Sequence, residues 1–196
     1  MKYLIYLSIF FISFKIHSQN EKLLPESIKL KKTYNELLND SNNSSLQEKY
    51  ITEFPDNAIT FKKVFDSPTF NQLYNDSHLY IFKLSELSQN HPKLVGEKLI
   101  KLCFELKVWN ADATSYIQHE TMIYANKYFN EFVGLSKKLN NENLKSLITF
   151  LTDVENFNSY HDYENFTKKL KLNNESNLLV LFEKSRKKRI NENKDQ

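Results

Sequence analysis

The chain has 196 residues, of which 40% are hydrophobic and 26% are charged, with two glycines, four prolines and a formal net charge of +3. This apolar content excludes a disordered tail, and the scarcity of glycine and proline excludes a collagen-like chain or a hairpin-rich β architecture. The length fits one domain with an adequate core.

Residues 1–18 have the pattern of a secretory signal peptide. Lys2 gives a positive start, residues 3–14 form an apolar run, and Ser18 is a small residue before a polar stretch. The run is shorter than the roughly 20 residues that span a bilayer, so we expect cleavage rather than a retained anchor. The mature chain is then exported to the periplasm or the medium. No cysteine stands directly after the run, so we expect no lipoprotein anchor.

The charge of the mature chain argues against nucleic acid as a partner. Loss of residues 1–18 removes Lys2 and Lys15 and lowers the formal net charge from +3 to +1. The densest group of the remaining cations lies in residues 184–189, just before the end of the chain. We expect this cluster in a last helical turn, where it complements the helix dipole. The alternative is contact with an anionic partner, such as lipid headgroups.

The spacing of apolar residues predicts helices and no strand in the first half of the mature chain. The expected helices cover residues 26–38, 46–54, 59–65 and 77–89. The polar stretch 39–45 is the best candidate for a linker. Asp56 is expected to cap the third helix. We therefore expect residues 19–45 to form a loosely attached helical segment and linker, before an all-α domain.

In the second half, Pro92 is expected in the first turn of a helix that reaches residue 108. The longest helix is expected over residues 111–139, where a wide apolar face predicts a central, buried position. Asn140 or Asn141 caps the next helix. Further helices are expected over residues 144–154, 163–170 and 176–190. The result is a single irregular multi-helix bundle over residues 46–190 with a polar tail at 191–196. A solenoid of helix pairs is the alternative, although no repeat of fixed period is found.

Several common chemistries lack their residues. Gly96 and Gly134 are the only glycines, so phosphate-binding loops and the serine nucleophile elbow are absent. Cys103 is the only cysteine, and its place on an apolar helical stripe predicts a buried hydrophobe. His119 and Glu120 lack the second histidine of a zinc-protease motif. We therefore expect no metal and no cofactor.

The candidate interaction residues surround the start of the predicted helix 111–139. Asp112, Ser115 and His119 share one helical face, and Trp109, the only tryptophan, precedes them. The three polar groups either line a pocket or form the solvent side of the helix. Trp109 is otherwise expected to anchor the incoming loop on the core.

A second group of titratable residues stands at a predicted helix start. His161, Asp162 and Glu164 form the densest such cluster in the chain. Acidic residues are favoured near the positive end of the helix dipole, so we expect a solvated helix start. A weak metal site is the alternative.

Three groups of residues carry a resemblance to a known family. They are Phe54, Pro55, Asp56 and Asn57 with Phe61 and Phe65, then Leu73 and Tyr74 with Tyr80, Ile81 and Phe82, and finally Trp109 with Ala111 and Asp112. Over residues 46–155 the chain resembles a family of small exported helical proteins of Gram-negative bacteria. The resemblance implies an exported all-α protein of uncharacterised function and supplies no catalytic residue.

Two classes of function compete. The first is a non-enzymatic interaction protein of the bacterial cell envelope with an unknown protein partner, for example an immunity protein that neutralises a toxin. The second is a small hydrolase or metal-dependent enzyme that uses His119 and Asp112, or the cluster at His161. Convergence of histidine and carboxylate groups in one concave pocket would favour the enzyme. The absence of a catalytic motif favours the interaction protein.

Overall fold

The computed structural model describes residues 23–65, 73–107, 113–154 and 160–194. Within these ranges the chain forms ten α-helices, one short 3-10 helix and no strand, which confirms the predicted all-α bundle. The helices are α1 (Pro25–Asn39), α2 (Ser44–Glu53), α3 (Ala58–Phe65), α4 (Ser77–Glu86), η1 (Leu87–Gln89), α5 (Pro92–Leu106), α6 (Ala113–Lys127), α7 (Phe129–Ser136), α8 (Asn141–Thr152), α9 (Tyr160–Leu172) and α10 (Ser176–Lys194).

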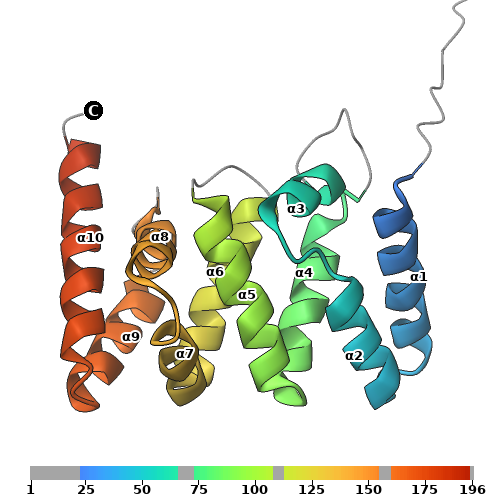
Figure 1. Ribbon diagram of the computed structural model, residues 1–196, viewed down its shortest axis with the longest axis horizontal. Helices are drawn as coiled ribbons and strands as arrows, with labels where there is room; N and C mark the ends of the chain where they lie inside the picture. The colour runs from blue at the N-terminus through green and yellow to red at the C-terminus, as the bar shows by residue number, and fades with distance from the viewer. Residues whose placement is uncertain (1–22, 66–72, 108–112, 155–159, 195–196) are drawn as a thin grey trace, which may run out of the picture.

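The helices are stacked in chain order along the long axis of the molecule, with α1 at one end and α10 at the other (Figure 1). Helices α2, α5, α8 and α10 contact one another in turn and form one layer, and α4, α6 and α9 form a second layer. Contacts of α5 with α6, and of α9 with α10, join the two layers. This is the stacking of helix pairs that α-solenoids use, and each pair buries its apolar face on its neighbours.

Helix α1 is part of the core, which corrects the expectation of a loosely attached segment. Leu30 and Leu37 are 0% and 1% exposed, and they are buried together with Thr33 along one stripe of the helix. The Tyr34 ring lies 4.7 Å from the ring of Tyr80 in α4, and the Thr33 hydroxyl donates a hydrogen bond to Glu53 of α2. The spacing of three and four residues gives α1 a continuous inward face, so burial fixes it in place.

The polar stretch that suggested a linker is a short turn tied to the next helices. The Asn43 side chain caps α2 by accepting a hydrogen bond from the Leu46 amide at 3.2 Å. Gln47 is buried, and its Nε2 donates to the Ser41 carbonyl at 2.6 Å. Its Oε1 accepts from Asn90 Nδ2 at 3.0 Å, just before α5. These bonds join the turn to the body of the protein.

The predicted long helix 111–139 is wrong, because the chain breaks it into α6 and α7. Tyr128 leaves the helical region with φ −114° and ψ 50°. After the break, the rings of Phe129 and Phe132 lie 5.9 and 5.4 Å from the ring of Phe166 in α9. The apolar face is too wide for one straight helix to bury on a single neighbour, and the change of direction brings its second half onto α9.

The boundaries of three other helices differ from the expectations. The side chain that caps α3 is Asn57, not Asp56, because Asn57 Oδ1 accepts from the Thr60 amide at 2.9 Å. Helix α5 ends before Lys107, which has a φ of 60°. Helix α10 continues to Lys194, so the basic segment 184–189 lies within the helix and not in its last turn.

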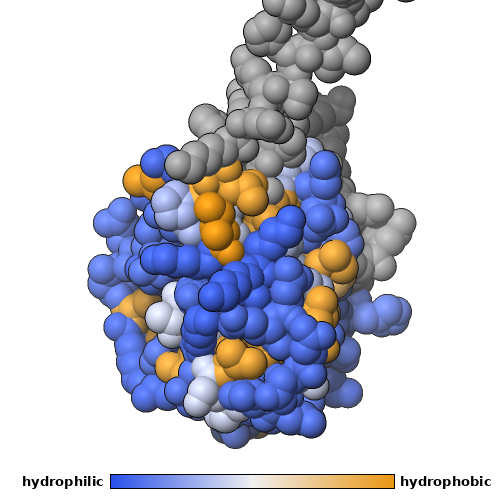
Figure 2. All heavy atoms as spheres, turned by 90° about the vertical axis from the view of Figure 1, so that its right-hand side faces the viewer, coloured by the Kyte–Doolittle hydropathy of each residue, from blue (hydrophilic) through white to orange (hydrophobic). Residues whose placement is uncertain are grey.

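The outer surface of α1 closes one end of the stack with a mostly hydrophilic face, on which apolar side chains are scattered (Figure 2). Ile28 and Leu38 are 48% and 59% exposed there. Terminal units of stacked helical proteins carry such polar outer faces because no further unit covers them. Helix α1 therefore acts as a cap on the aromatic core.

Candidate functional site

Helix α6 carries the two predicted interaction residues that the structure describes, Ser115 and His119. Ser115 is partly buried, and His119 is exposed. Trp109 and Asp112 lie outside the described residues. His119 has no hydrogen bond or ion pair with any residue in the described ranges. Of the two expected arrangements, the structure therefore shows the imidazole on the solvent side of the helix.

A cluster of three rings lies beside this part of α6. His78 and Phe82 of α4 and Tyr116 of α6 have centroids 5.7 to 6.0 Å apart. Phe82 meets both other rings edge to face, the geometry that the charge distribution of aromatic rings favours. Phe82 is also 38% exposed. We call the surface formed by His78, Phe82, Tyr116 and His119 the α4–α6 face.

A hollow of about 290 Å³ adjoins the α4–α6 face and shares Phe82 with it. Its walls come from α4, η1 and α6. The lining residues are Phe82, Ser85, Glu86, Ser88, Glu120, Ile123, Tyr124 and Lys127. Five of these residues are polar or charged, and Phe82, Ile123 and Tyr124 supply the apolar and aromatic part of the lining.

Glu120 is the unusual residue of this hollow. Its side chain is only 8% exposed, yet it has no hydrogen bond or ion pair with any described residue. Glu86, in contrast, lies 2.6 Å from Lys83 Nζ. The Lys127 ammonium lies over the ring of Tyr128, 5.3 Å from its centroid. Glu120 therefore lines the hollow as a carboxylate without an ion-pair partner among the described residues, and Lys127 adds a positive charge to the same lining.

The α6 wall of the hollow, to which Glu120 and Tyr124 both belong, is held in place by the core. The Tyr124 hydroxyl donates to the Pro92 carbonyl at 2.8 Å, and burial raises the pKa of this tyrosine. Gly96 of α5 allows the close approach, because a methyl group at this position would overlap the Tyr124 hydroxyl. An anionic group between aromatic walls is suited to an ammonium or a guanidinium group, which binds both carboxylates and ring faces.

The residues of the alternative enzyme do not converge in the described parts of the chain. His161 and Glu164 are exposed at the start of α9. The backbone carbonyl of Asp162 accepts a hydrogen bond from Asn126 Nδ2 at 3.0 Å. No group of three histidine, cysteine or acidic side chains in the described ranges is arranged to hold a metal ion.

Cys103 is a buried hydrophobe, as predicted. The side chain is fully buried, and its thiol donates a weak hydrogen bond to Thr121 Oγ1 at 3.2 Å. Burial raises the pKa of the Cys103 thiol to about 12. A thiol that stays protonated and inaccessible is a poor nucleophile.

Sequence reasoning missed Glu120 as a candidate binding residue. The available signal was a charged residue inside the wide apolar face of α6, where Ile117, Thr121 and Tyr124 are also buried. Ile123, three residues further on, and Tyr116, four residues earlier, lie on the same side of the helix. An acidic residue in such a position is rare unless it has a partner.

Comparison with known proteins gives no match to a family model, a curated protein or a solved structure. None of the described helices combines the length and the apolar character that a bilayer crossing requires. The class of the protein is therefore defined by its own fold and site: an all-α stack of helix pairs with an aromatic face and an anionic hollow.

Proposed function

We propose that this protein is a non-enzymatic interaction protein whose α4–α6 face binds a partner protein. A lysine or arginine side chain of the partner enters the hollow and pairs with Glu120. The observation that carries this proposal is Glu120, a residue that is only 8% exposed and whose carboxylate has no partner among the described residues. The exposed edge of Phe82 supports it, because aromatic residues next to a pocket are typical centres of protein interfaces.

The energetics favour a bound cation over an empty hollow. In the free protein the Glu120 carboxylate lines the hollow without a hydrogen-bond or ion-pair partner among the described residues. A hydrogen bond to a charged group contributes about 1.5–3 kcal/mol, which a partner cation would supply at this position.

We also propose that the mature chain acts outside the cytoplasm, in the bacterial cell envelope. The support is the pattern of residues 1–18, with its basic start and apolar run. Intact-mass measurement of protein from a secreting bacterial host is expected to show loss of these residues. Retention of Met1 in the secreted material would contradict cleavage.

The binding proposal is tested with small probes of the expected side chain. Two probes are titrated into 15N-labelled protein: Nα-acetyl-lysine methylamide, whose ε-amino group is free, and Nα-acetyl-arginine methylamide. Binding is followed through the backbone amide signals in NMR spectra. We expect the amide signals of Glu120 and Ile123 to move. The norleucine analogue, which lacks the charge, should bind at least tenfold more weakly if the ion pair contributes about 1.4 kcal/mol or more.

Glu120→Gln is the decisive variant, because it removes the charge and keeps the shape. It is expected to abolish the preference for the charged probes. Glu164→Gln makes the same charge change at an exposed position of α9 and serves as the control. The same pair of variants is then used as bait for envelope proteins. Equal binding of the charged probes by wild type and Glu120→Gln would contradict the proposal.

A further inference from the structure

We propose that the groove between α8 and α10 is a second binding site, for a single-chain amphiphilic anion such as a medium-chain carboxylate. The groove has a volume of about 340 Å³. Its lining residues are Lys145, Ile148, Thr149, Leu181, Lys184, Ser185 and Lys188. This set is independent of the α4–α6 face, with which it shares no residue.

The lining of the groove divides into an apolar floor and a cationic rim. Ile148 is buried and Leu181 is partly buried, and together they form the apolar part. The three amino groups of Lys145, Lys184 and Lys188 surround it. An apolar chain fits the floor and an anionic head group fits the rim.

The positive charge of this rim is only slightly neutralised within the described chain. Lys188 lies 3.6 Å from an oxygen of Glu192, which is its only ion-pair partner among the described residues. Lys145 and Lys184 have no acidic partner in the same ranges. The three lysines thus have one carboxylate partner among the described residues, so a bound anion would balance part of the remaining positive charge.

The helix dipole does not explain this group of lysines. A dipole stabilises cations only within the last turn of a helix. Helix α10 runs to Lys194, so Lys184 and Lys188 both precede its last turn. Their position beside an apolar groove is the feature that requires an explanation.

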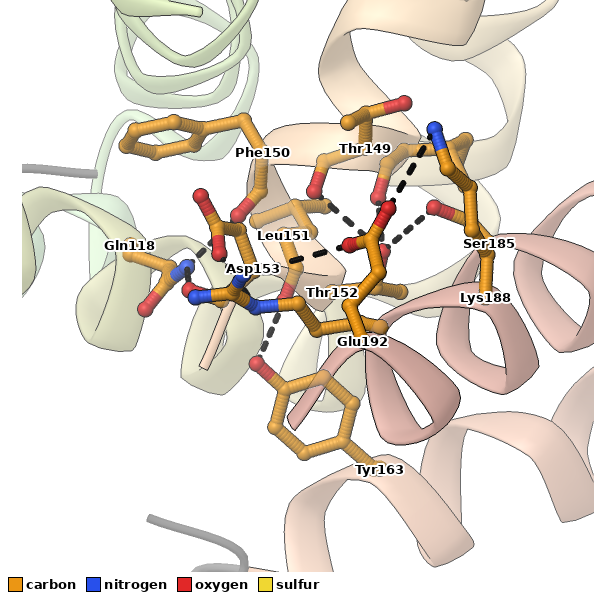
Figure 3. Close-up of polar contacts among 12 residues, drawn as sticks. Gln118, Thr149, Phe150, Leu151, Thr152, Asp153, Tyr163, Ser185, Lys188 and Glu192 are labelled. Carbon is orange, nitrogen blue, oxygen red and sulfur yellow. Dashed lines mark hydrogen bonds and ion pairs between the residues drawn. The ribbon is translucent and has the colours of Figure 1, made fainter. Parts of the chain in front are cut away.

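The two helices that form the groove are fixed to each other by polar contacts (Figure 3). The hydroxyls of Thr152 and Ser185 lie 2.6 Å apart. Next to them, Arg189 Nε lies 2.8 Å from Asp153 Oδ1. These contacts hold α10 against the end of α8, so the groove exists before a ligand arrives. A preformed site loses less entropy on binding.

The end of α8 is in turn fixed by helices of the other layer (Figure 3). Gln118 Nε2 of α6 donates to the carbonyls of Phe150 and Asp153 at 2.5 and 2.8 Å. The Tyr163 hydroxyl of α9 donates to the Leu151 carbonyl. Side chains therefore satisfy carbonyl groups that a helix end leaves without partners. These hydrogen bonds hold the end of α8, which forms one side of the groove, in a fixed position.

The shape of the groove favours a free single-chain molecule over a bilayer surface. Its volume lies near the lower limit of small-molecule sites, which hold roughly 300–1,000 Å³. The groove lies between two helices. A flat membrane surface cannot place a headgroup on the cationic rim and an acyl chain on the apolar floor at the same time. Thr149 is exposed at this rim and adds a hydroxyl for the head group.

The experiment is calorimetric titration of the mature protein with dodecanoate below its micellar concentration. We expect one dodecanoate per chain and much weaker binding of acetate and of dodecyltrimethylammonium. Each of Lys145→Gln, Lys184→Gln and Lys188→Gln is expected to weaken binding roughly threefold, as for solvent-exposed ion pairs. Lys187→Gln removes an exposed charge from the same helix outside the groove and should leave the affinity unchanged.

Three results would overturn the proposal. Equal binding of dodecyltrimethylammonium would show that only apolar contact matters. An equal loss in Lys187→Gln would show a diffuse effect of charge. Binding to vesicles of anionic phospholipid without binding of free dodecanoate would assign the lysines to a membrane surface. Glu120→Gln should bind dodecanoate normally, so this test is independent of the proposed partner site.

Discussion

Arg189 Nε of α10 lies 2.8 Å from Oδ1 of Asp153, the residue that follows α8, and both side chains are largely shielded from water. This pair joins the last helix to the end of an earlier one. We expect Arg189→Gln and Asp153→Asn each to destabilise the protein, with a coupling energy of about 1 kcal/mol in a double-mutant cycle. Urea unfolding of the two single variants and the double variant measures it. Strictly additive effects would show that the pair contributes nothing.

Replacement by alanine is expected to change stability in opposite directions at the two glycines. Gly96→Ala places a methyl group against the Tyr124 hydroxyl and against Leu135 Cδ1 at 2.9 Å. We expect it to destabilise the fold by about 1–3 kcal/mol, as overpacking does. Gly134→Ala meets nothing within 4 Å on an exposed helical position and should stabilise by about 0.5–1 kcal/mol. Thermal unfolding compares the variants, and a stabilising Gly96→Ala would contradict the packing.

Buried hydroxyl and thiol groups predict a loss of stability in alkali. Burial raises the pKa of Tyr80 and that of Cys103 to about 12, and it also raises the pKa of Tyr50 and Tyr163. Above about pH 9 the unfolded chain releases these protons while the folded chain keeps them, so the free energy of unfolding falls as pH rises towards 12. Urea unfolding at pH 8, 10 and 11 tests this. Constant stability over that range would contradict the prediction.

The packing of α1 predicts that alanine substitutions at two of its residues change the free energy of unfolding by very different amounts. Leu30 is fully buried, so Leu30→Ala should cost about 2–5 kcal/mol of stability. Ile28 lies on the outer side of the same helix, and Ile28→Ala should change stability by less than about 0.5 kcal/mol. Denaturant unfolding separates the two. Similar small effects of both substitutions would restore the expectation of a loosely attached segment.

Periodicity was sufficient to predict the helices but not their tertiary neighbours. Pro92 and Asn140 mark helix starts in the sequence and do so in the structure, because their effects are local. The break at Tyr128 lacks proline or glycine and depends on contacts with α9. The attachment of Leu30 likewise depends on residues of other helices. Local patterns contain no information on such contacts.

The candidate site was predicted only in part for the same reason. His119 was selected from its spacing along one helix, and in the structure it is exposed and does not line the hollow. The hollow itself requires Phe82 of α4, about 40 residues earlier in the chain. The position of Glu120 within the apolar face of α6 was visible in the sequence, but the helices that cover it, α4 and η1, were not. Glu120 is buried only where α4, η1 and α6 come together.

The stacking of the helices in chain order has a consequence for how the molecule forms and opens. In the described ranges, strongly contacting helices are at most three α-helices apart along the chain. Such low contact order allows fast folding, because short loops close before long-range contacts are required. Opening should start at the two ends, where α1 and α10 each have neighbours on one side only. Amide exchange would then slow progressively towards α5 and α6, and this gradient would separate a sequentially opening stack from an all-or-none globule.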